Sequence, residues 1–355
     1  MADIIVNYST DIVRGTLEVL ERSELKALVR PGMKVSLKPN LVVVKPPSQG
    51  ATTHPEIVEG LIIYLKDLGI RDIEIIESAG TMDNTKKAFR ACGYNELSQR
   101  HGVALFDLKD DKKVKKQVGE YRFEICARAL NTDFLINLPV LKVHSQTLLT
   151  CCLKNLKGCL SDNEKRRFHA MGLHRPIAFL NKAIKTGFCL IDGICGDLSI
   201  ELGGSPITRN MILAGKDPLL LDSYCAGLIG FKTEEIEYIG IAATEGVGRL
   251  YDRSAVVEEL NSDNKPALIR ADPAAARVAR WIAEDKACSA CYGALVYALK
   301  RIGGAPGKVP SISVGQGFRG KTGSYGCGDC TGGFDQYAPG CPPAAADIVA
   351  FLRAQ

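Results

Sequence analysis

The stretch "KVSLKPNLVVVKPPSQGATTHPEIVEGLIIYLKDLGIRDIEIIES", residues 34–78, decides the fold. Its first part, 34–44, is apolar and β-branched and predicts a buried strand, and 72–78 predicts a second one. Residues 53–69 between them have the apolar spacing of a helix, with Thr53 as the expected N-cap. A strand–helix–strand unit of this kind predicts two parallel strands in one sheet.

The same alternation continues along the chain. Further strands are predicted in "VALFDL", "DFLINLPVLKV", "FCLIDGI" and "NMILAG", and helices in "NTKKAFRACGYNELSQRHG" and "DPLLLDSYCAGLIGF". This order predicts an α/β fold with mostly parallel sheets and helices on both faces, followed by a C-terminal cysteine-rich segment. A charged, alanine-rich stretch near 250–285 places a boundary at about 262. We therefore expect an α/β domain over 1–262 and a cluster-binding region over 263–355.

The composition indicates a globular protein in a reducing compartment. Apolar residues make up 46% of the 355 residues, enough for a large core. The chain shows no signal peptide and no apolar run of membrane-spanning length, so we expect a cytoplasmic protein that binds no membrane. The net charge is only +5, and aromatic residues, at 6%, lie away from the basic runs, which argues against nucleic-acid binding. In such a compartment the 13 cysteines are expected to be thiols or metal ligands.

Five of these cysteines fall in two C-terminal stretches, "CSAC" (288–291) and "SYGCGDCTGGFDQYAPGCPP" (324–343). Each stretch precedes an expected helix, and the prolines of the second are expected in the first helical turn. Helix N-termini favour thiolates and an anionic cluster, and glycines let backbone N–H groups approach its sulfurs. A [4Fe–4S] cluster is the favoured occupant, with zinc or reduced thiols as alternatives. Cys151, Cys152 and Cys159 form a weaker candidate for a second metal site.

Polar side chains gather at the predicted carboxyl ends of strands, where open α/β sheets bind ligands. Glu77, Ser78 and Asp192 are among them, and residues 138–174 are dense in Lys, His and Asn. These residues predict a cleft for a small carboxylate or phosphate, with His144 or His169 as the proton donor. The expected substrate-binding residues are Lys38, Asn40, His54, Lys154, Asn155 and Lys157, and the expected catalytic residues are Lys142, His144 and His169. The alternative is a solvent-exposed helix face whose histidines have ordinary hydrogen-bond partners and no function. The chain has no GxSxG motif of the serine hydrolase type.

Several motifs resemble the domain-of-unknown-function family 362, a family of uncharacterised iron–sulfur proteins. They are "KPNLV", "TTHPEIV", "NLPVLKVHSQTLLTCCLKNLKGC", "GKDPLLLD" and the terminal "GCPP", and the resemblance covers essentially the whole chain. It implies a fold similar to that of lactate racemase-type proteins, an α/β architecture in two lobes. It also implies that Cys288, Cys291, Cys330 and Cys341 bind the cluster, with Cys327 as the alternative to Cys330. It implies no reaction.

The residues and the resemblance together predict a [4Fe–4S] oxidoreductase that acts on a small anionic substrate and exchanges electrons with a ferredoxin-like partner. Four thiolates leave no open iron, so the cluster is expected to transfer electrons rather than act as a Lewis acid. Three alternatives stay open. The first is an isomerase or racemase whose cluster is structural and takes part in no redox step. The second is a non-catalytic electron carrier or cluster-binding module. The third is a binding protein whose C-terminal segment is held together by zinc.

Overall fold

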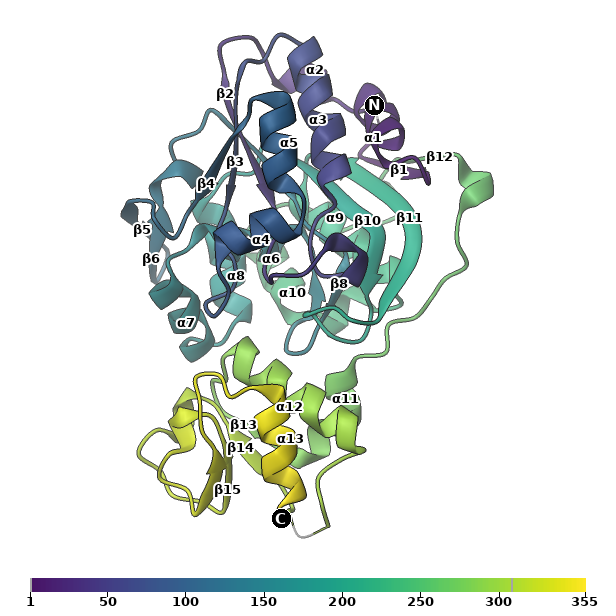
Figure 1. Ribbon diagram of the computed structural model, residues 1–355. Helices are drawn as coiled ribbons and strands as arrows, with labels where there is room; N and C mark the ends of the chain where they lie inside the picture. The colour runs from purple at the N-terminus through teal and green to yellow at the C-terminus, as the bar shows by residue number, and fades with distance from the viewer. Residues whose placement is uncertain (1, 308) are drawn as a thin grey trace.

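The computed structural model describes residues 2–307 and 309–355, which form a large α/β lobe and a smaller C-terminal lobe joined by an extended segment (Figure 1). Eight strands form the main sheet, in the order β12-β1-β11-β10-β7-β2-β3-β4. Their bounds are β12 Val257–Leu260, β1 Ile4–Tyr8, β11 Pro206–Gly215, β10 Phe188–Asp197, β7 Phe134–Leu138, β2 Lys34–Pro39, β3 Asp72–Glu77 and β4 Ala104–Asp107. All neighbouring pairs are parallel except the two that involve β11. The prediction of an α/β fold with a mostly parallel main sheet is confirmed.

Helices cover both faces of this sheet, because successive strand side chains point to opposite faces. Ile4 and Val6 of β1 belong to one core, whereas Ile5 belongs to the other. The core around Ile5 includes α1 Ile12–Arg22, α3 Pro55–Asp67, α4 Thr85–Ala91 and α5 Tyr94–His101. The opposite core includes α6 Cys152–Asn155, α7 Asp162–Ala170, α8 His174–Ala183, α9 Pro218–Leu228 and α10 Glu237–Thr244. Two hairpins, β5 Lys113–Val118 with β6 Tyr121–Cys126 and β8 Lys142–His144 with β9 Leu148–Thr150, join this second core.

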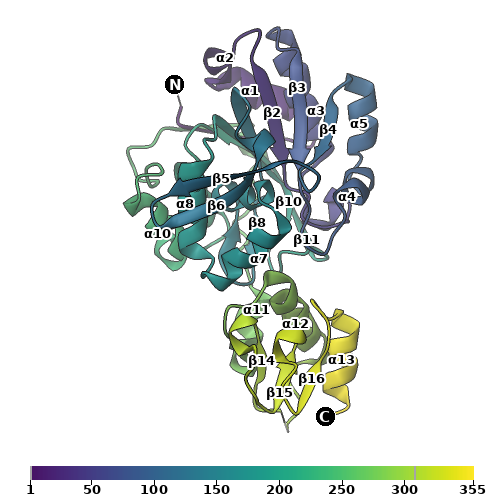
Figure 2. The same cartoon turned by 90° about the vertical axis from the view of Figure 1, so that its left-hand side faces the viewer.

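The C-terminal lobe has its own parallel sheet, in the order β13-β14-β15-β16. The strands are β13 Ile282–Glu284, β14 Ile312–Val314, β15 Tyr325–Cys327 and β16 Gln336–Ala338. The helices α11 Ala274–Val278, α12 Ser289–Ile302 and α13 Ala345–Arg353 pack with this sheet in a third core (Figure 2). Residues 261–273 connect β12 to α11, and the predicted boundary at 262 lies in this segment. Independent folding of the two parts stays a prediction.

Local signals explain most of the element ends, and two predictions about them are wrong. Asp217 caps α9 as its "DP" start implies, because its carboxylate accepts the N–H groups of Leu219 and Leu220. Thr53 is not the N-cap of α3. Its hydroxyl donates to the carbonyl of Leu138 instead, and His54 takes the N-cap position. The C-terminal prolines precede α13, which starts at Ala345, rather than occupying its first turn.

Candidate functional site

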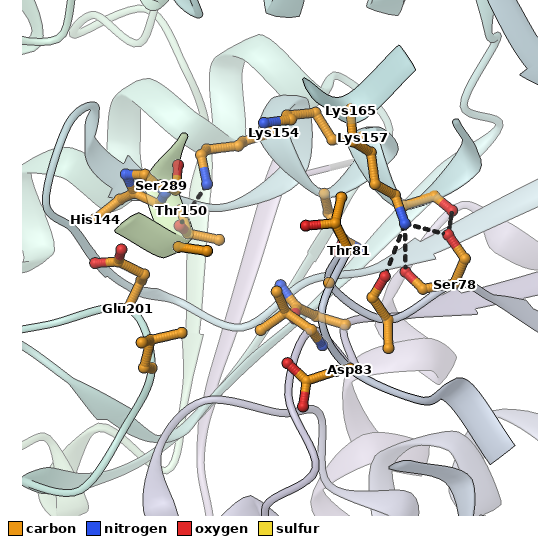
Figure 3. Close-up of a pocket in the computed structure, with 18 of the residues that line it drawn as sticks. Ser78, Thr81, Asp83, His144, Thr150, Lys154, Lys157, Lys165, Glu201 and Ser289 are labelled. Carbon is orange, nitrogen blue, oxygen red and sulfur yellow. Dashed lines mark hydrogen bonds between the residues drawn. The ribbon is translucent and has the colours of Figure 1, made fainter. Parts of the chain in front are cut away.

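A cavity of about 170 Å³ lies at the carboxyl ends of β2 and β3, where the C-terminal lobe meets the large lobe (Figure 3). One water needs roughly 10–15 Å³ in this measure, so the cavity holds on the order of ten non-hydrogen atoms. Of the nine residues predicted for the cleft, His54 alone is outside the lining, which contains Lys38, Asn40, Lys142, His144, Lys154, Asn155, Lys157 and His169. Six lysine and arginine side chains line the cavity against three carboxylates. The cavity is therefore suited by charge and by size to a small anion.

Lys38 forms an ion pair with a carboxylate of the neighbouring strand β3. Its Nζ donates to Glu77 Oε2 at 2.8 Å, and both side chains are almost fully buried. The other Glu77 oxygen accepts the N–H of Ser78. The space around this pair is tight, because a Cβ at Gly158 would lie 2.6 Å from Lys38 Nζ. Lys38 therefore positions the floor of the cavity and keeps little charge for a ligand.

Lys142 is held by two backbone carbonyls. Its Nζ donates to Ala51 at 2.6 Å and to the carbonyl of Glu201 at 2.9 Å. Burial lowers its pKa to about 8, although Glu201 acts in the opposite direction. About half of the Lys142 side chains are therefore neutral at pH 8.

Lys154 and Lys157 are the cations that a ligand would meet. In the part of the chain that the structure describes, neither forms an ion pair within 4.0 Å. Lys154 reaches only the Thr150 hydroxyl, at 3.5 Å, and Lys157 Nζ lies 3.3 Å from His169 Nε2. Burial, followed by the Lys165 charge, lowers the pKa of Lys157 to about 7. Burial, followed by the Lys157 charge, also holds the pKa of Lys154 well below its usual range. Both side chains lack a counter-ion in the described chain, so a bound anion would stabilise their charged forms, and this wall is the anion-binding part of the candidate site.

His144 is held in one tautomer by the backbone. Its Nδ1 lies 3.1 Å from the N–H of Gln146 and 3.4 Å from that of Thr147, so it accepts and the proton resides on Nε2. Burial, and then Lys154, hold its pKa well below the usual range. A neutral imidazole is a weak acid, so His144 is suited to donating a hydrogen bond rather than a proton. Burial, and then Lys157, also hold the pKa of His169 well below its usual range. In the Lys157–His169 pair, Lys157 is therefore the group suited to proton transfer.

The structure places His54 away from the cavity. Its ring Nδ1 lies 2.8 Å from Asp192 Oδ2, and its backbone N–H donates to the same oxygen. Burial lowers the pKa of His54, but the Asp192 carboxylate outweighs this effect and raises it to about 11. His54 and Asp192 therefore form a buried ion pair at the start of α3, and the prediction that His54 lines the cleft is wrong.

The C-terminal lobe closes one side of the cavity through the start of α12. Cys288, Ser289 and Ala290 all belong to the lining, and Figure 3 shows Ser289 on the same side as His144 and Glu201. Ser289 Oγ donates to the Gln146 side chain, whose amide donates in turn to the carbonyl of Ala287. These bonds hold the N-terminus of α12 against the large lobe.

The C-terminal cysteines converge beside this contact. Cys288 is the N-cap of α12 and Cys291 lies in its first turn, while Cys330 and Cys341 lie on the loops that flank β16. Burial raises the pKa of Cys291, and the other four cysteines, Cys327 first, raise it further. Cys327 differs from the rest because it is only 1% exposed, within the core of the small lobe, and burial raises its pKa to about 12.

The structure groups Cys151 and Cys152 with Asp222 rather than with Cys159, the third residue of the predicted second metal site. Cys152 begins α6, but the helix ends at Asn155, so Cys159 does not share its face. The ligand atoms of Cys151 and Cys152 instead lie within 4.8 Å of an Asp222 oxygen and of each other.

The sequence reasoning missed several residues that line the cavity. They are Ala79, Gly80, Thr81, Met82 and Asp83 after β3, Lys165 and Arg166 on α7, Glu201 on the β10–β11 connection, and Ser289. Lys165 belongs to the charged run "EKRRFH", residues 164–169. It is buried, with its Nζ bonded to Ser78 and to the carbonyl of Ala79. Of these residues, only Thr81 and Asp83 could have been found from the sequence, because they are polar and follow the predicted strand 72–78.

Comparisons with known proteins identify relatives but no activity. The family model described as "Domain of unknown function (DUF362)" matches residues 35–227, which confirms the resemblance. The chain is 27% identical over 195 residues to the "Thylakoid-associated protein sll1697" of Synechocystis sp., a match that covers 52% of this chain and 59% of that protein. The chain thus aligns with less than two thirds of this curated relative. No helix in the described chain is both long and apolar enough to cross a membrane.

Two solved structures are similar in part. The lactate racemase apoprotein from Thermoanaerobacterium thermosaccharolyticum is 14% identical, with a TM-score of 0.44, over 65% of this chain and 57% of that chain. A structural-genomics protein from Thermotoga maritima is 13% identical, with a TM-score of 0.34, over 51% of this chain and 49% of that chain.

Proposed function

This chain belongs to the DUF362 family, whose description assigns no activity, and we propose from the site itself that it is a [4Fe–4S] oxidoreductase acting on a small anionic substrate. The observation that carries the proposal is the position of Cys288, which lines the same cavity as Lys154, Lys157 and His169. A cluster bound through Cys288 would therefore lie beside a bound anion.

The C-terminal cysteines fit such a cluster in three respects. Gln316 Nε2 lies 3.6 Å from Cys288 Sγ and Arg319 Nε lies 3.4 Å from Cys330 Sγ, so two of the thiols have N–H donors. Gly328 leaves open the space that a Cβ would fill, 3.4 Å from Cys291 Sγ. Finally, no three of the five C-terminal sulfurs in the described chain lie within 4.8 Å of one another.

This spacing favours a cluster over zinc. Zinc–sulfur bonds of about 2.3 Å place the sulfurs around one tetrahedral ion about 3.8 Å apart. In a [4Fe–4S] cluster each thiolate binds a different iron, so the sulfurs stand farther apart. The burial of Cys327 in the core supports Cys288, Cys291, Cys330 and Cys341 as the ligands.

A bound cluster would supply one-electron transfer. The chain's own residues would do the rest. Lys154 and Lys157 would attract and hold the anion, and His144 would donate a hydrogen bond from Nε2. Lys157, with a pKa of about 7 and in contact with His169, would exchange the proton that accompanies reduction. The exposed Cys341 would bring the cluster near the surface, where a ferredoxin-like donor could reach it.

The test uses anaerobically reconstituted, dithionite-reduced protein and a panel of small carboxylates and phosphates. We expect at least one of them to oxidise the cluster and remove its EPR signal. The Lys154→Met/Lys157→Met variant should lose this reaction, whereas Lys26→Met, an exposed lysine on the short helix Leu25–Leu28, should keep it. The proposal fails if no anion oxidises the cluster, or if the double variant reacts as fast as the wild type.

The Lys157–His169 contact also supports a second function, a redox-silent isomerase in which this pair moves a proton and the cluster only stabilises the small lobe. In that case Cys330→Ala/Cys341→Ala should still exchange a substrate C–H with solvent deuterium. A non-catalytic electron carrier would instead tolerate Lys154→Ala without loss of electron transfer.

A further inference from the structure

A group of thiols is buried far from the C-terminal cysteines, between α6 and α9. Cys151 and Cys152 stand at the start of α6, and Asp222 and Cys225 lie one helical turn apart on α9. All four side chains are fully buried. We call these four residues the α6–α9 thiol group.

The spacing within the group is that of ligands around one ion. Cys151 Sγ and Cys152 Sγ are 3.9 Å apart, and an Asp222 oxygen lies within 4.8 Å of both. Two thiolates on one tetrahedral zinc stand about 3.8 Å apart, given zinc–sulfur bonds of about 2.3 Å. Cys225 lies beside Cys151, one helical turn after Asp222 on α9. The C-terminal cysteines, by contrast, contain no set of three this close among the residues described.

No cationic side chain pairs with Asp222 in the described structure. Its carboxylate accepts the N–H groups of Cys152 and Leu153. Each carboxylate oxygen has two lone pairs. Asp222 can therefore accept the N–H groups at the start of α6 and bind a metal ion at the same time.

Arg209 supplies an independent observation. It is 97% buried, and its Nε and Nη1 have no hydrogen-bond partner in the described chain. Only its Nη2 is bonded, to the carbonyl of Leu141. The Cys225 thiol of the group lies near this guanidinium. A buried cation with two free donors requires an anion, and thiolates bound to a divalent ion would provide one.

We propose that Cys151, Cys152, Asp222 and Cys225 form a buried site for a thiophilic divalent cation of the zinc type. Three thiolates and one carboxylate around such an ion leave a net charge of −2, which Arg209 partly offsets. All four ligand residues are fully buried, so the site is structural and takes up its ion as the chain folds. Because α6 also carries Lys154 and Asn155, the ion fixes one wall of the cavity.

The test starts from a full-length variant whose C-terminal cysteines cannot bind metal, Cys288→Ala/Cys330→Ala/Cys341→Ala. We expect this parent to retain about one zinc per chain by mass spectrometry of the metal. Adding Asp222→Asn or Cys225→Ala should lower the zinc content at least tenfold. Adding Cys189→Ala, which removes a buried thiol beside Cys152 that lies outside the group, should leave it unchanged.

A second readout applies even if the ligand variants do not fold. The parent refolded with cobalt should show the visible d–d bands of a tetrahedral thiolate site. The proposal is overturned if the parent holds neither zinc nor cobalt, in which case these thiols are small core residues. It is equally overturned if Asp222→Asn and Cys225→Ala keep the full zinc content. Because iron and sulfide are measured separately, this outcome is independent of the cluster.

Discussion

Replacing Lys38 by Met should destabilise the large lobe strongly, because it leaves the Glu77 carboxylate buried without its partner. The two charges are 2.8 Å apart with side-chain exposures of 0% and 3%. At an effective dielectric constant of about 20, this attraction amounts to about 6 kcal/mol. Removing one partner of a buried pair costs about 3–5 kcal/mol in practice. We expect the free energy of unfolding, measured by urea titration at pH 7, to fall by about 3–5 kcal/mol.

The same strand provides the control. Lys34 pairs with Glu74 at 3.2 Å but is 29% exposed, so Lys34→Met should cost about 1 kcal/mol or less. The double variant Lys38→Met/Glu77→Met removes both charges and should recover much of the loss. If Lys38→Met costs no more than Lys34→Met, or if the double variant shows no recovery, the buried pair does not stabilise this edge of the sheet as we argue.

Three further predictions concern the site and its surroundings. Sulfate binding, measured by calorimetry, should weaken as the pH rises through about 7, because Lys157 then loses its charge; Lys157→Arg should lose much less affinity than the wild type between pH 6 and 7.5, and a pH-independent wild type would contradict the assignment. Asp192→Asn should destabilise the protein most below pH 6.5, the unfolded pKa of His54, and the difference from wild type should vanish as the pH rises through about 11, the folded pKa; a constant difference in urea titrations argues against the ion pair. Gly328→Ala should lower the iron content well below that of Gly320→Ala, since both positions have positive φ but only a Cβ at 328 meets a cysteine sulfur; equal iron contents would remove Gly328 from the cluster site.

The alternation of elements made the sheet and the place of the cavity predictable. Lys38 and Lys142 follow apolar runs that read as strands, and parallel strands bring their carboxyl ends to one edge. The density of Lys, His and Asn in residues 138–174 then pointed to the chemistry of that edge. This reasoning needs only the order of strands and crossover helices, which local patterns specify well.

The partners of these residues could not be predicted in the same way. His54 pairs with Asp192, 138 residues away, and nothing near either residue marks the pair. Lys165 lies in a run of charges that resembles a solvated helix face, yet tertiary contacts bury it against the end of β3. Glu201 follows β10 on a turn-rich connection that carries no pattern of its own. Burial by distant segments, which decides these cases, leaves no local periodicity.

The antiparallel β11 is a further case. The pattern showed a strand after β10 but not its direction, because a short connection of residues 198–205 replaces the crossover helix that parallel neighbours need.

The most direct test of the central claim is the content of iron and acid-labile sulfide in anaerobically purified full-length protein, with EPR after dithionite. The proposed [4Fe–4S] site predicts about four of each per chain and a signal that appears on reduction. Both should be lost in Cys330→Ala and kept in Cys327→Ala. Zinc alone, or free thiols without iron at the C-terminal cysteines, would contradict the account and leave the Lys154–Lys157 cavity as a site without a redox centre.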